Sequence, residues 1–262
     1  MSVATATESK LTPTSPEIAI TCRGVVKEFG AGQTRIRVLR GVDMEASFGE
    51  ITFLVGPSGC GKTTLISIIA GLLTPNSGQV DVLGQRLGKL RGGRLVNFRA
   101  HNLGFIFQQF NLIPTLTAVE NASVSLVAQG VGLGKAVKLA GEIFDRLGMK
   151  DQRHKYPNQL SGGQQQRVAI ARALVHQPRL VICDEPTASL DAETGRSVML
   201  MLKELALASD RAVLVVTHDD RIYSFADRIN HMSDGLITRV TTQADVSDSQ
   251  VQAFVQPDPQ ES

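Results

Sequence analysis

The sequence predicts an α/β fold with a mostly parallel core sheet, an N-terminal antiparallel β subdomain and an inserted helical subdomain. Three short apolar runs support this prediction, because polar or glycine residues follow each one at once: ITFLV before GPSG, LVIC before DEPT, and VLVV before THDD. Runs without polar alternation are typical of strands buried on both faces of a parallel sheet. Ligands bind beyond the carboxyl ends of such strands, so the three polar segments are expected to meet in one crevice.

The elements outside the core follow from similar patterns. Alternating apolar residues at about 18–45 predict antiparallel strands on the flank of the core. Helical segments near 116–129 and 135–147 are joined by the glycine-bearing link GVGLG. We therefore expect an inserted helical subdomain at about 87–160.

Composition predicts where the globular domain begins and ends. Among 262 residues, 42% are hydrophobic and 20% are charged, which is typical of a globular domain, here expected over 17–242. The two ends, 1–16 and 243–262, are rich in Ser, Thr, Pro, Asp and Gln, which predicts flexible tails.

Charge, cysteine content and hydropathy exclude several classes of protein. A net charge of +2 argues against bulk binding to nucleic acid, and three scattered cysteines argue against a disulfide framework or a zinc site. No apolar run reaches the roughly 18 residues of a membrane-spanning helix. The start MSVATATESK lacks a secretion signal, which predicts a cytoplasmic protein.

Residues 56–63 spell GPSGCGKT and meet the phosphate-loop pattern. The glycines allow backbone N–H groups to surround phosphate oxygens, Lys62 adds a point charge, and the Thr63 hydroxyl can bind magnesium. The preceding strand and following helix are the context that this pattern requires, so the sequence predicts the phosphate and Mg²⁺ site of a P-loop NTPase fold. The residues expected to hold the nucleotide phosphates are Gly56, Pro57, Ser58, Gly59, Cys60, Gly61, Lys62, Thr63 and Thr64.

Two carboxylates and a histidine follow the other two core strands. Asp184 and Glu185 end the LVIC strand, where one carboxylate can orient magnesium and the other can act as general base on water. Taken alone, Asp184 followed by Glu185 and Pro186 could equally begin a turn or cap a helix. His218 closes the third strand and could hydrogen-bond the γ-phosphate or hold the attacking water, although a lone histidine is more often a satisfied polar group.

Residues 160–164 read LSGGQ and lead into the helical pattern QQRVAIARALV. Ser161 with Gln164 three residues later fits a capping box. A cap does not explain Gly162 and Gly163, because a glycine in a helix costs about 1 kcal/mol relative to alanine. The two glycines indicate a backbone that comes close to another group, and the helix N-terminus predicts a second anion site.

In combination, these motifs resemble the ATPase subunits of ATP-binding-cassette (ABC) transporters. LSGGQ follows a phosphate loop, and CDEPTASLD and VVTHD come next in that order, over about residues 18–240. The resemblance implies a head-to-tail homodimer in which each ATP lies between one subunit's phosphate loop and its partner's LSGGQ. It assigns Glu185 as catalytic base, Asp184 to magnesium and His218 to the γ-phosphate, and it places Asp191, in ASLD, on a loop that crosses the dimer interface.

Two further residues have roles that only the resemblance implies. Gln108 in GFIFQQFNL is assigned to magnesium, the attacking water and the transmembrane partner. Gln109 is its neighbour, but the spacing after Phe107 favours Gln108. Phe29 stands where the family places an aromatic ring, usually tyrosine, that stacks on adenine, and phenylalanine keeps the π-face.

Finer resemblance points to one branch of the family. FQQFNLIPTLTAVEN and VVTHDDRIYSFADRINHMSDG resemble the branch that serves lipoprotein release, macrolide export and heterocyst-type glycolipid export. It implies export or extrusion of a lipophilic substrate through a separate permease, with a periplasmic adaptor as a further partner, from the inner face of the cell membrane. Residues 111–126 are the favoured site for the permease's coupling helix. The basic segment 85–101 fits a solvated face, or contact with anionic headgroups.

Three alternatives remain beside this interpretation. The polar amino-acid importers share FQQFNL and LSGGQQQRVAIARAL. A cell-division relative of the same branch would regulate a wall hydrolase through a membrane partner without moving cargo. A stand-alone GTPase or kinase is disfavoured, because the sequence has no NKxD segment to read guanine and LSGGQ would have no purpose.

Overall fold

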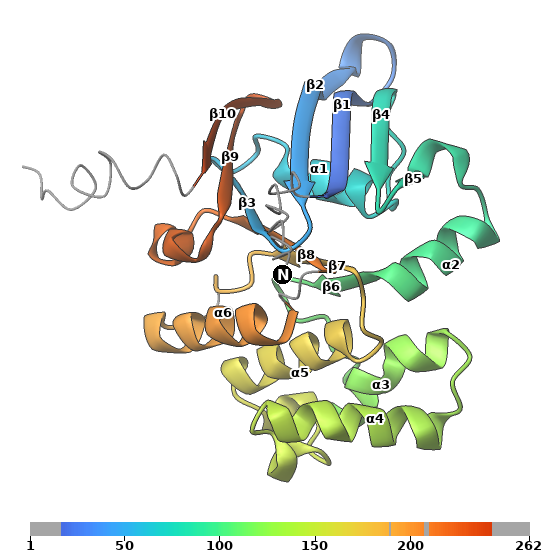
Figure 1. Cartoon of the computed structure of the whole chain (residues 1–262), viewed down its shortest axis with the longest axis vertical. Helices are drawn as coiled ribbons and strands as arrows, with labels where there is room; N and C mark the ends of the chain where they lie inside the picture. Colours follow the sequence, from blue (N-terminus) through green and yellow to red (C-terminus); the bar gives the residue numbers. More distant parts are fainter. Residues whose placement is uncertain (1–16, 189, 207–209, 243–262) are drawn as a thin grey trace, which may run out of the picture.

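The computed structural model describes residues 17–188, 190–206 and 210–242 and contains two sheets with helices around them (Figure 1). The smaller sheet has the order β2-β1-β4-β5 and is antiparallel throughout. Its strands are β1 (Ile18–Phe29), β2 (Ile36–Ser47), β4 (Ser77–Val82) and β5 (Gln85–Arg86). This sheet confirms the predicted N-terminal antiparallel subdomain, and β4 and β5 extend it from further along the chain.

The larger sheet has the order β10-β9-β3-β8-β7-β6. All its pairs are parallel except β10 with β9, which confirms the mostly parallel core. Every residue of β3 and β8 is buried, as the unbroken apolar runs predicted. The strands are β3 (Ile51–Val55), β6 (Leu103–Ile106), β7 (Leu180–Asp184), β8 (Ala212–Thr217), β9 (Arg228–Ser233) and β10 (Leu236–Thr242).

Six α-helices and five 3₁₀ turns occur within the described residues. The helices are α1 (Lys62–Ile69), α2 (Gly93–Asn102), α3 (Ala118–Ala128), α4 (Leu133–Arg146), α5 (Gly162–Leu174) and α6 (Ala192–Ala206). The 3₁₀ turns are η1 (Gly32–Thr34), η2 (Leu87–Lys89), η3 (Lys150–Gln152), η4 (Pro157–Gln159) and η5 (Asp220–Phe225). Helices α3 and α4 lie where the sequence predicted helices, and β6 also falls within the 87–160 segment.

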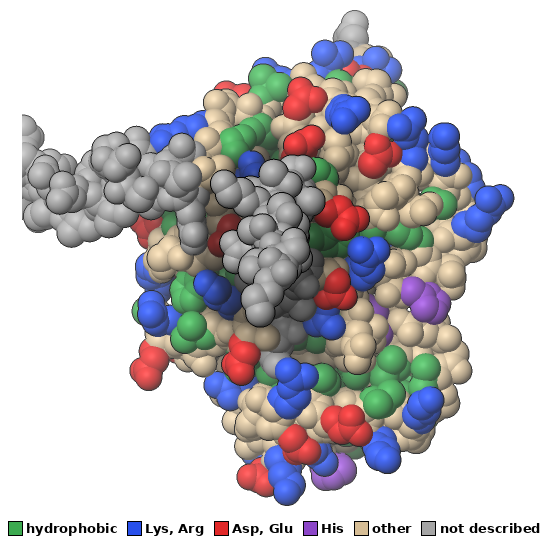
Figure 2. All heavy atoms as spheres, in the orientation of Figure 1, with side chains coloured by type: hydrophobic (Ala, Val, Ile, Leu, Met, Phe, Trp, Pro, Cys, Tyr) green, Lys and Arg blue, Asp and Glu red, His purple; other side chains and the backbone are tan. Residues whose placement is uncertain are grey.

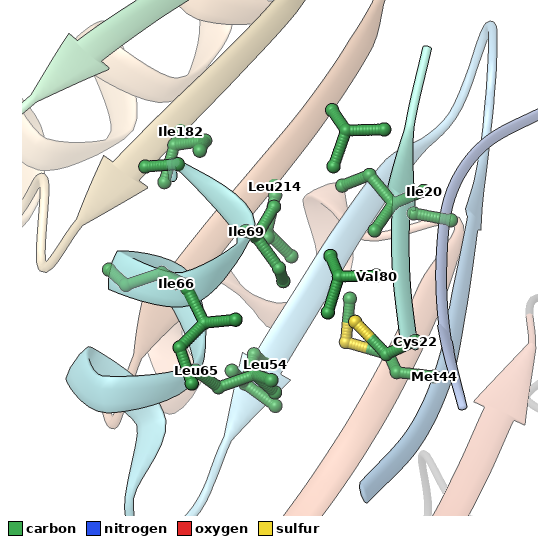
Figure 3. Close-up of a cluster of buried hydrophobic side chains, with 14 of the residues drawn as sticks. Ile20, Cys22, Met44, Leu54, Leu65, Ile66, Ile69, Val80, Ile182 and Leu214 are labelled. Carbon is green, nitrogen blue, oxygen red and sulfur yellow. The ribbon is translucent and has the colours of Figure 1, made fainter. Parts of the chain in front are cut away.

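Helix α1 lies between the two sheets. Figure 3 shows Leu65, Ile66 and Ile69 of α1 beside Leu54 of β3 and Ile20 of β1, all fully buried. At about 25 cal/mol per Å² of buried apolar area, such side chains each stabilise the fold by about 1.5–3 kcal/mol. This packing holds the start of α1 in place relative to the core sheet.

The opposite face of the core sheet packs on α5 and α6. Helix α5 belongs to two buried clusters, since Ile170 and Leu174 pack against the sheet whereas Val168 and Ala171 pack against α3 and α4. In Figure 1 this helical layer lies below the sheet. Helix α5 is therefore the element that joins the core sheet to the other helices.

Basic and acidic side chains are interspersed over much of the visible described surface in Figure 2, and several basic side chains gather at its upper right. None of the helices in the described part of the chain is long and apolar enough to span a membrane.

Candidate active site

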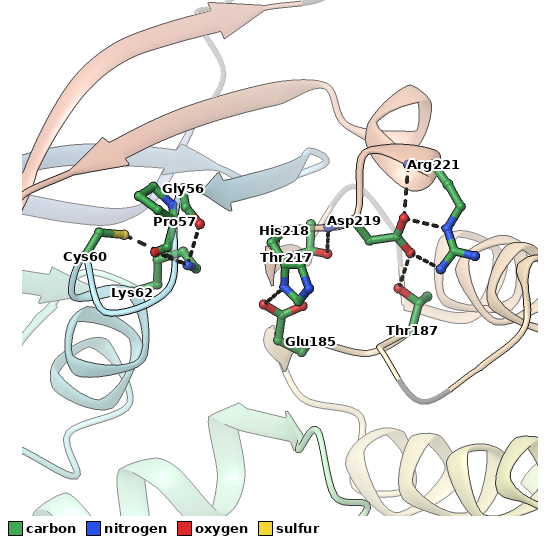
Figure 4. A network of polar contacts seen from close by, with 10 residues as sticks. All are labelled: Gly56, Pro57, Cys60, Lys62, Glu185, Thr187, Thr217, His218, Asp219 and Arg221. Atoms are coloured by element: carbon green, nitrogen blue, oxygen red, sulfur yellow. Dashed lines mark hydrogen bonds and ion pairs between the residues drawn. The ribbon is translucent and has the colours of Figure 1, made fainter. Parts of the chain in front are cut away.

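The loop GPSGCGKT connects β3 to α1. Lys62 is buried, and its Nζ donates hydrogen bonds to the carbonyl oxygens of Gly56 (2.7 Å) and Pro57 (3.0 Å), as Figure 4 shows. Ser58 and Thr63 are exposed, so their hydroxyls are accessible while the lysine stem is covered. The loop therefore presents backbone and hydroxyl groups to solvent around a single buried cation.

The hairpin of β9 and β10 supports this loop from behind. The backbone N–H of Gly235, in the turn of the hairpin, donates to the carbonyl of Cys60 at 3.1 Å. A Cβ on Gly56 would lie 2.0 Å from the carbonyl oxygen of Met232, and the φ of Gly56 is +152°. Only glycine fits at that position, because both the dihedral and the neighbouring backbone exclude a side chain.

Asp184, Glu185 and His218 lie at the same edge of the core sheet as the loop. Parallel pairing brings the carboxyl ends of β3, β7 and β8 together, with Val55 beside Thr217 and Asp184 beside Val216. This arrangement matches the crevice that the sequence predicted at the ends of the strands.

Glu185 is held firmly at that edge. Its backbone N–H donates to the carbonyl of Val216 at 2.8 Å, and its φ is +52°, a left-handed conformation that is costly for a residue with a side chain. Nδ1 of His218 lies 2.7 Å from Oε1 of Glu185 (Figure 4). Oε2 of Glu185 is buried and has no hydrogen-bond partner among the described residues.

Asp184 has an environment that suits a cation. Burial first, and then the charge of Glu185, raises the pKa of the Asp184 carboxyl, while Lys62 acts in the opposite direction. A cation placed next to this carboxylate would offset both costs. With the exposed hydroxyl of Thr63, the site offers the hard oxygen donors that Mg²⁺ prefers. Within the described residues no group of three or more His, Cys, Asp or Glu lies close enough to hold a metal ion.

A network beyond His218 was not predicted from the sequence. Arg221 donates to both carboxylate oxygens of Asp219, from Nε at 2.7 Å and from a terminal nitrogen at 2.8 Å, and this holds the pKa of Asp219 below its usual range. The Thr187 hydroxyl donates to the same carboxylate at 3.1 Å. The network joins the end of β8 to the segment that follows Glu185 (Figure 4). The run THDDR was its only signal in the sequence.

The LSGGQ segment forms the N-terminus of α5, in the helical layer. The expected capping box is present: the Ser161 hydroxyl accepts from the N–H of Gln164 at 3.3 Å, and the N–H of Ser161 donates to Oε1 of Gln164 at 3.0 Å. A Cβ on Gly163 would lie 2.8 Å from Cγ2 of Thr194, so packing gives a reason for that glycine. At Gly162 the nearest atom would be 3.9 Å away, on Leu190. Packing among the described residues does not explain Gly162.

The remaining predicted residues come from other segments of the chain. Phe29 ends β1 with its ring 42% exposed, and Nζ of Lys27 lies 5.1 Å from the ring centroid. Gln108 follows β6 and is exposed. Asp191 precedes α6 and accepts the N–H of Thr194 at 3.0 Å, which lowers the pKa of Asp191.

Comparisons with known proteins agree with this geometry. A sequence model of the family described as ABC transporter matches residues 39–188. The chain is 38% identical over 229 residues to the lipoprotein-releasing system ATP-binding protein LolD 2 of Rhodopirellula baltica, covering 85% of this chain and 90% of that protein. It is 41% identical over 216 residues to the macrolide export ATP-binding/permease protein MacB of Chromobacterium violaceum, covering 82% of this chain and 33% of that protein.

A solved structure has the same fold. The dimeric cassette MJ0796, in a post-hydrolysis state bound to ADP and Pi, superposes with a TM-score of 0.79 at 38% identity, covering 85% of this chain and 98% of that one. The chain spans 63% of the length of two uncharacterised relatives from Mycobacterium tuberculosis, each 40% identical to it over 210 residues.

Proposed function

This chain belongs to the ABC transporter family and is an ATPase cassette of that family, and we propose that two copies of it use ATP to drive a separate membrane permease. The proposal rests mainly on one observation, the juxtaposition of a phosphate loop with a half-buried carboxylate pair and a hydrogen-bonded histidine at one sheet edge. We propose residues 17–242 as the ATPase domain, with its helical subdomain at about 87–160.

We propose that the loop from Gly56 to Thr64 binds the nucleotide phosphates through its backbone N–H groups. Lys62 contributes charge, and its bonds to two loop carbonyls keep it at the centre of the loop. Magnesium would be held by Thr63, Asp184 and Gln108, where it would neutralise charge on the phosphates. Phe29 would stack on the base, because its exposed ring lies at the end of β1.

Glu185 would act as general base on the attacking water. One of its oxygens is bound to His218 and the other is free to accept a proton, so the carboxylate can be oriented and still react. His218 contacts Glu185 through Nδ1, which leaves Nε2 to act toward water or the γ-phosphate. The left-handed backbone at Glu185 fixes the direction of the side chain.

We propose that the site is completed by a second copy of the chain. Ser161, Gly162, Gly163 and Gln164 would meet the γ-phosphate held by the partner subunit's loop, with Asp191 at the same interface. The exposed helix N-terminus of α5 and the uncrowded Gly162 support this arrangement, and MJ0796 is itself a dimeric cassette.

For transport, we propose export or extrusion of a lipophilic substrate by a permease that docks on residues 111–126, on the cytoplasmic face of the membrane. The names of LolD 2 and MacB, a lipoprotein-releasing protein and a macrolide exporter joined to its permease, support this direction. A periplasmic adaptor would reach the complex through the permease. An importer of polar amino acids is the alternative, and the neighbouring reading frames separate the two, because a four-helix permease and a periplasmic adaptor would favour export.

Two variants of the full chain test the ATPase proposal. Glu185→Gln is expected to bind ATP and to turn over at least about a hundredfold more slowly, as loss of a general base implies. Ser161→Ala is expected to lose hydrolysis while the monomer keeps its affinity for nucleotide. Normal turnover by Glu185→Gln would remove Glu185 from its role, and weaker binding by the Ser161→Ala monomer would show that Ser161 acts within its own subunit.

A further inference from the structure

The turn just after Gln108 has a strained backbone. Phe110 and Asn111 have φ values of 57° and 48°, in the left-handed region that residues other than glycine rarely adopt. The N–H of Phe110 donates to the carbonyl of Phe107 at 3.1 Å, so Gln108 and Gln109 lie within this tight turn. Strain of this kind persists only where the surroundings hold the backbone in place.

Arg172, in the last turn of α5, holds this strained turn in place. Its guanidinium donates to the carbonyl of Phe110 and to the carbonyl of Asn111, both at 2.6 Å. The same group lies 6.0 Å from the ring centroid of Phe107, which stacks on Phe105 of β6 at 4.3 Å. A planar guanidinium can bind two successive carbonyls at once, which the single ammonium of lysine does less well.

Arg172 is also fixed on its own side. It is half-buried, and burial lowers the pKa of its guanidinium. The Ser125 hydroxyl of α3 donates to the backbone carbonyl of Arg172 at 2.8 Å. The position at the C-terminal end of α5 favours a cation there. The turn is thus attached to the helical layer and not only to the strand that precedes it.

Helix α5 links three parts of the proposed site. It begins at Ser161, and Arg172 lies about 17 Å further along at 1.5 Å per residue. Between them, Nε2 of the fully buried Gln166 donates to the carbonyl of Pro186 at 2.9 Å, next to Glu185. One rigid helix therefore touches the LSGGQ segment, the Glu185 segment and the Gln108 turn.

We propose that Arg172 is a positioning residue for Gln108. Arg172 acts by fixing the turn of Phe110 and Asn111, which follows Gln108, to the C-terminal end of α5. Any movement of the helical layer then moves Gln108 relative to the phosphate loop. The inference rests on the proposed function, because it takes Gln108 to act at the nucleotide. Neither the family motifs nor the sequence patterns singled out this arginine.

The test uses Arg172→Lys in the full chain, with Arg167→Lys as the matched control. Arg167 lies on the same helix and also donates to a backbone carbonyl, that of Leu147 at 3.2 Å, but this acceptor is not part of the Gln108 turn. For Arg172→Lys we expect kcat to fall about tenfold or more, with KM for ATP and monomer affinity within about twofold of the parent, because a small misplacement of a catalytic group is costly. Arg167→Lys is expected to keep the parent's kcat.

Two further readouts separate positioning from a general structural effect. Amide hydrogen exchange at residues 108–113 is expected to accelerate in Arg172→Lys and not in Arg167→Lys. In a Gln108→Ala background, Arg172→Lys is expected to reduce kcat no further, since it acts through Gln108. If Arg172→Lys unfolds at the assay temperature, Arg172→Met provides the same comparison without a buried ammonium.

The proposal is overturned if exchange in the turn is unchanged, if exchange rises with no loss of kcat, or if the losses of Arg172→Lys and Gln108→Ala multiply. A parent chain without ATPase activity would instead refute the proposed function. The exchange experiment does not depend on activity, so it would still show whether Arg172 holds the turn.

Discussion

Replacing Gly162 by alanine should stabilise the chain and abolish most of its activity. The methyl group would have one neighbour, Cδ2 of Leu190 at 3.9 Å, which is an ordinary contact. Gly162 is also not among the glycines with positive φ, so alanine can adopt its backbone conformation. A compatible Gly→Ala change gains about 0.4–1 kcal/mol, which raises the melting temperature of a domain this size by about 1–4 °C.

Catalysis should respond in the opposite direction. The added methyl would stand where the backbone of one subunit is proposed to meet the partner's phosphate. Loss of one hydrogen bond to a charged group costs about 1.5–3 kcal/mol, or about 10- to 150-fold in turnover. Steady-state hydrolysis at saturating Mg-ATP, nucleotide binding to the monomer and thermal unfolding measure the three quantities on one preparation.

Gly163→Ala is the matched control, because its Cβ would lie 2.8 Å from Cγ2 of Thr194. Overpacking of this kind costs about 1–3 kcal/mol, so that variant should melt at a lower temperature than the parent. Parent-like turnover by Gly162→Ala would refute the proposed close approach of the Gly162 backbone to the phosphate held by the partner subunit. A lower melting temperature for Gly162→Ala would refute the assignment of an open site.

Two predictions concern ionisable groups. Asp184→Asn should melt at a higher temperature than the parent at neutral pH without nucleotide, and lose hydrolysis. Because folding raises the pKa of Asp184, the ionised carboxylate destabilises the folded parent at pH values above that pKa. The difference in melting temperature between parent and variant should therefore vanish in acid, where Asp184 is protonated. An equal melting temperature of the two proteins at neutral pH would contradict this prediction. Burial lowers the pKa of His176, whose Nε2 bonds the Leu103 carbonyl at 3.0 Å. The unfolded chain therefore binds the extra proton first, and urea midpoints should fall as pH drops below about 6.5, less steeply in His176→Gln; identical slopes would remove His176 as a cause.

The sequence predicted the elements whose signal is local. ITFLV and VLVV are apolar throughout because both faces of β3 and β8 are covered, and GPSGCGKT carries its own geometry. β6 was not predicted, since it has four residues and includes Gly104. A Cβ on Gly104 would lie 2.3 Å from the carbonyl of Ala173 in α5, so packing between distant segments decides that residue.

In the site, too, residues with a local sequence signal were predicted, and residues that depend on contacts between distant segments were not. The residues at strand ends were found because each follows a recognisable run. Arg172 was missed because its acceptors are backbone carbonyls more than 60 residues away, and such a bond leaves no sequence pattern. The role of Asp219 likewise depends on Thr187, 32 residues earlier, which only the fold brings near.

The support that the β9–β10 hairpin gives to the phosphate loop has a consequence for biosynthesis. β3 pairs with β8 and β9, which are synthesised long after β3, and the carbonyl of Met232 packs against Gly56. At about 5–20 residues per second, the nascent loop waits roughly 10–35 s for its support. Until then the apolar β3 strand lacks the strands that it pairs with in the fold, and exposed apolar segments of this kind promote aggregation.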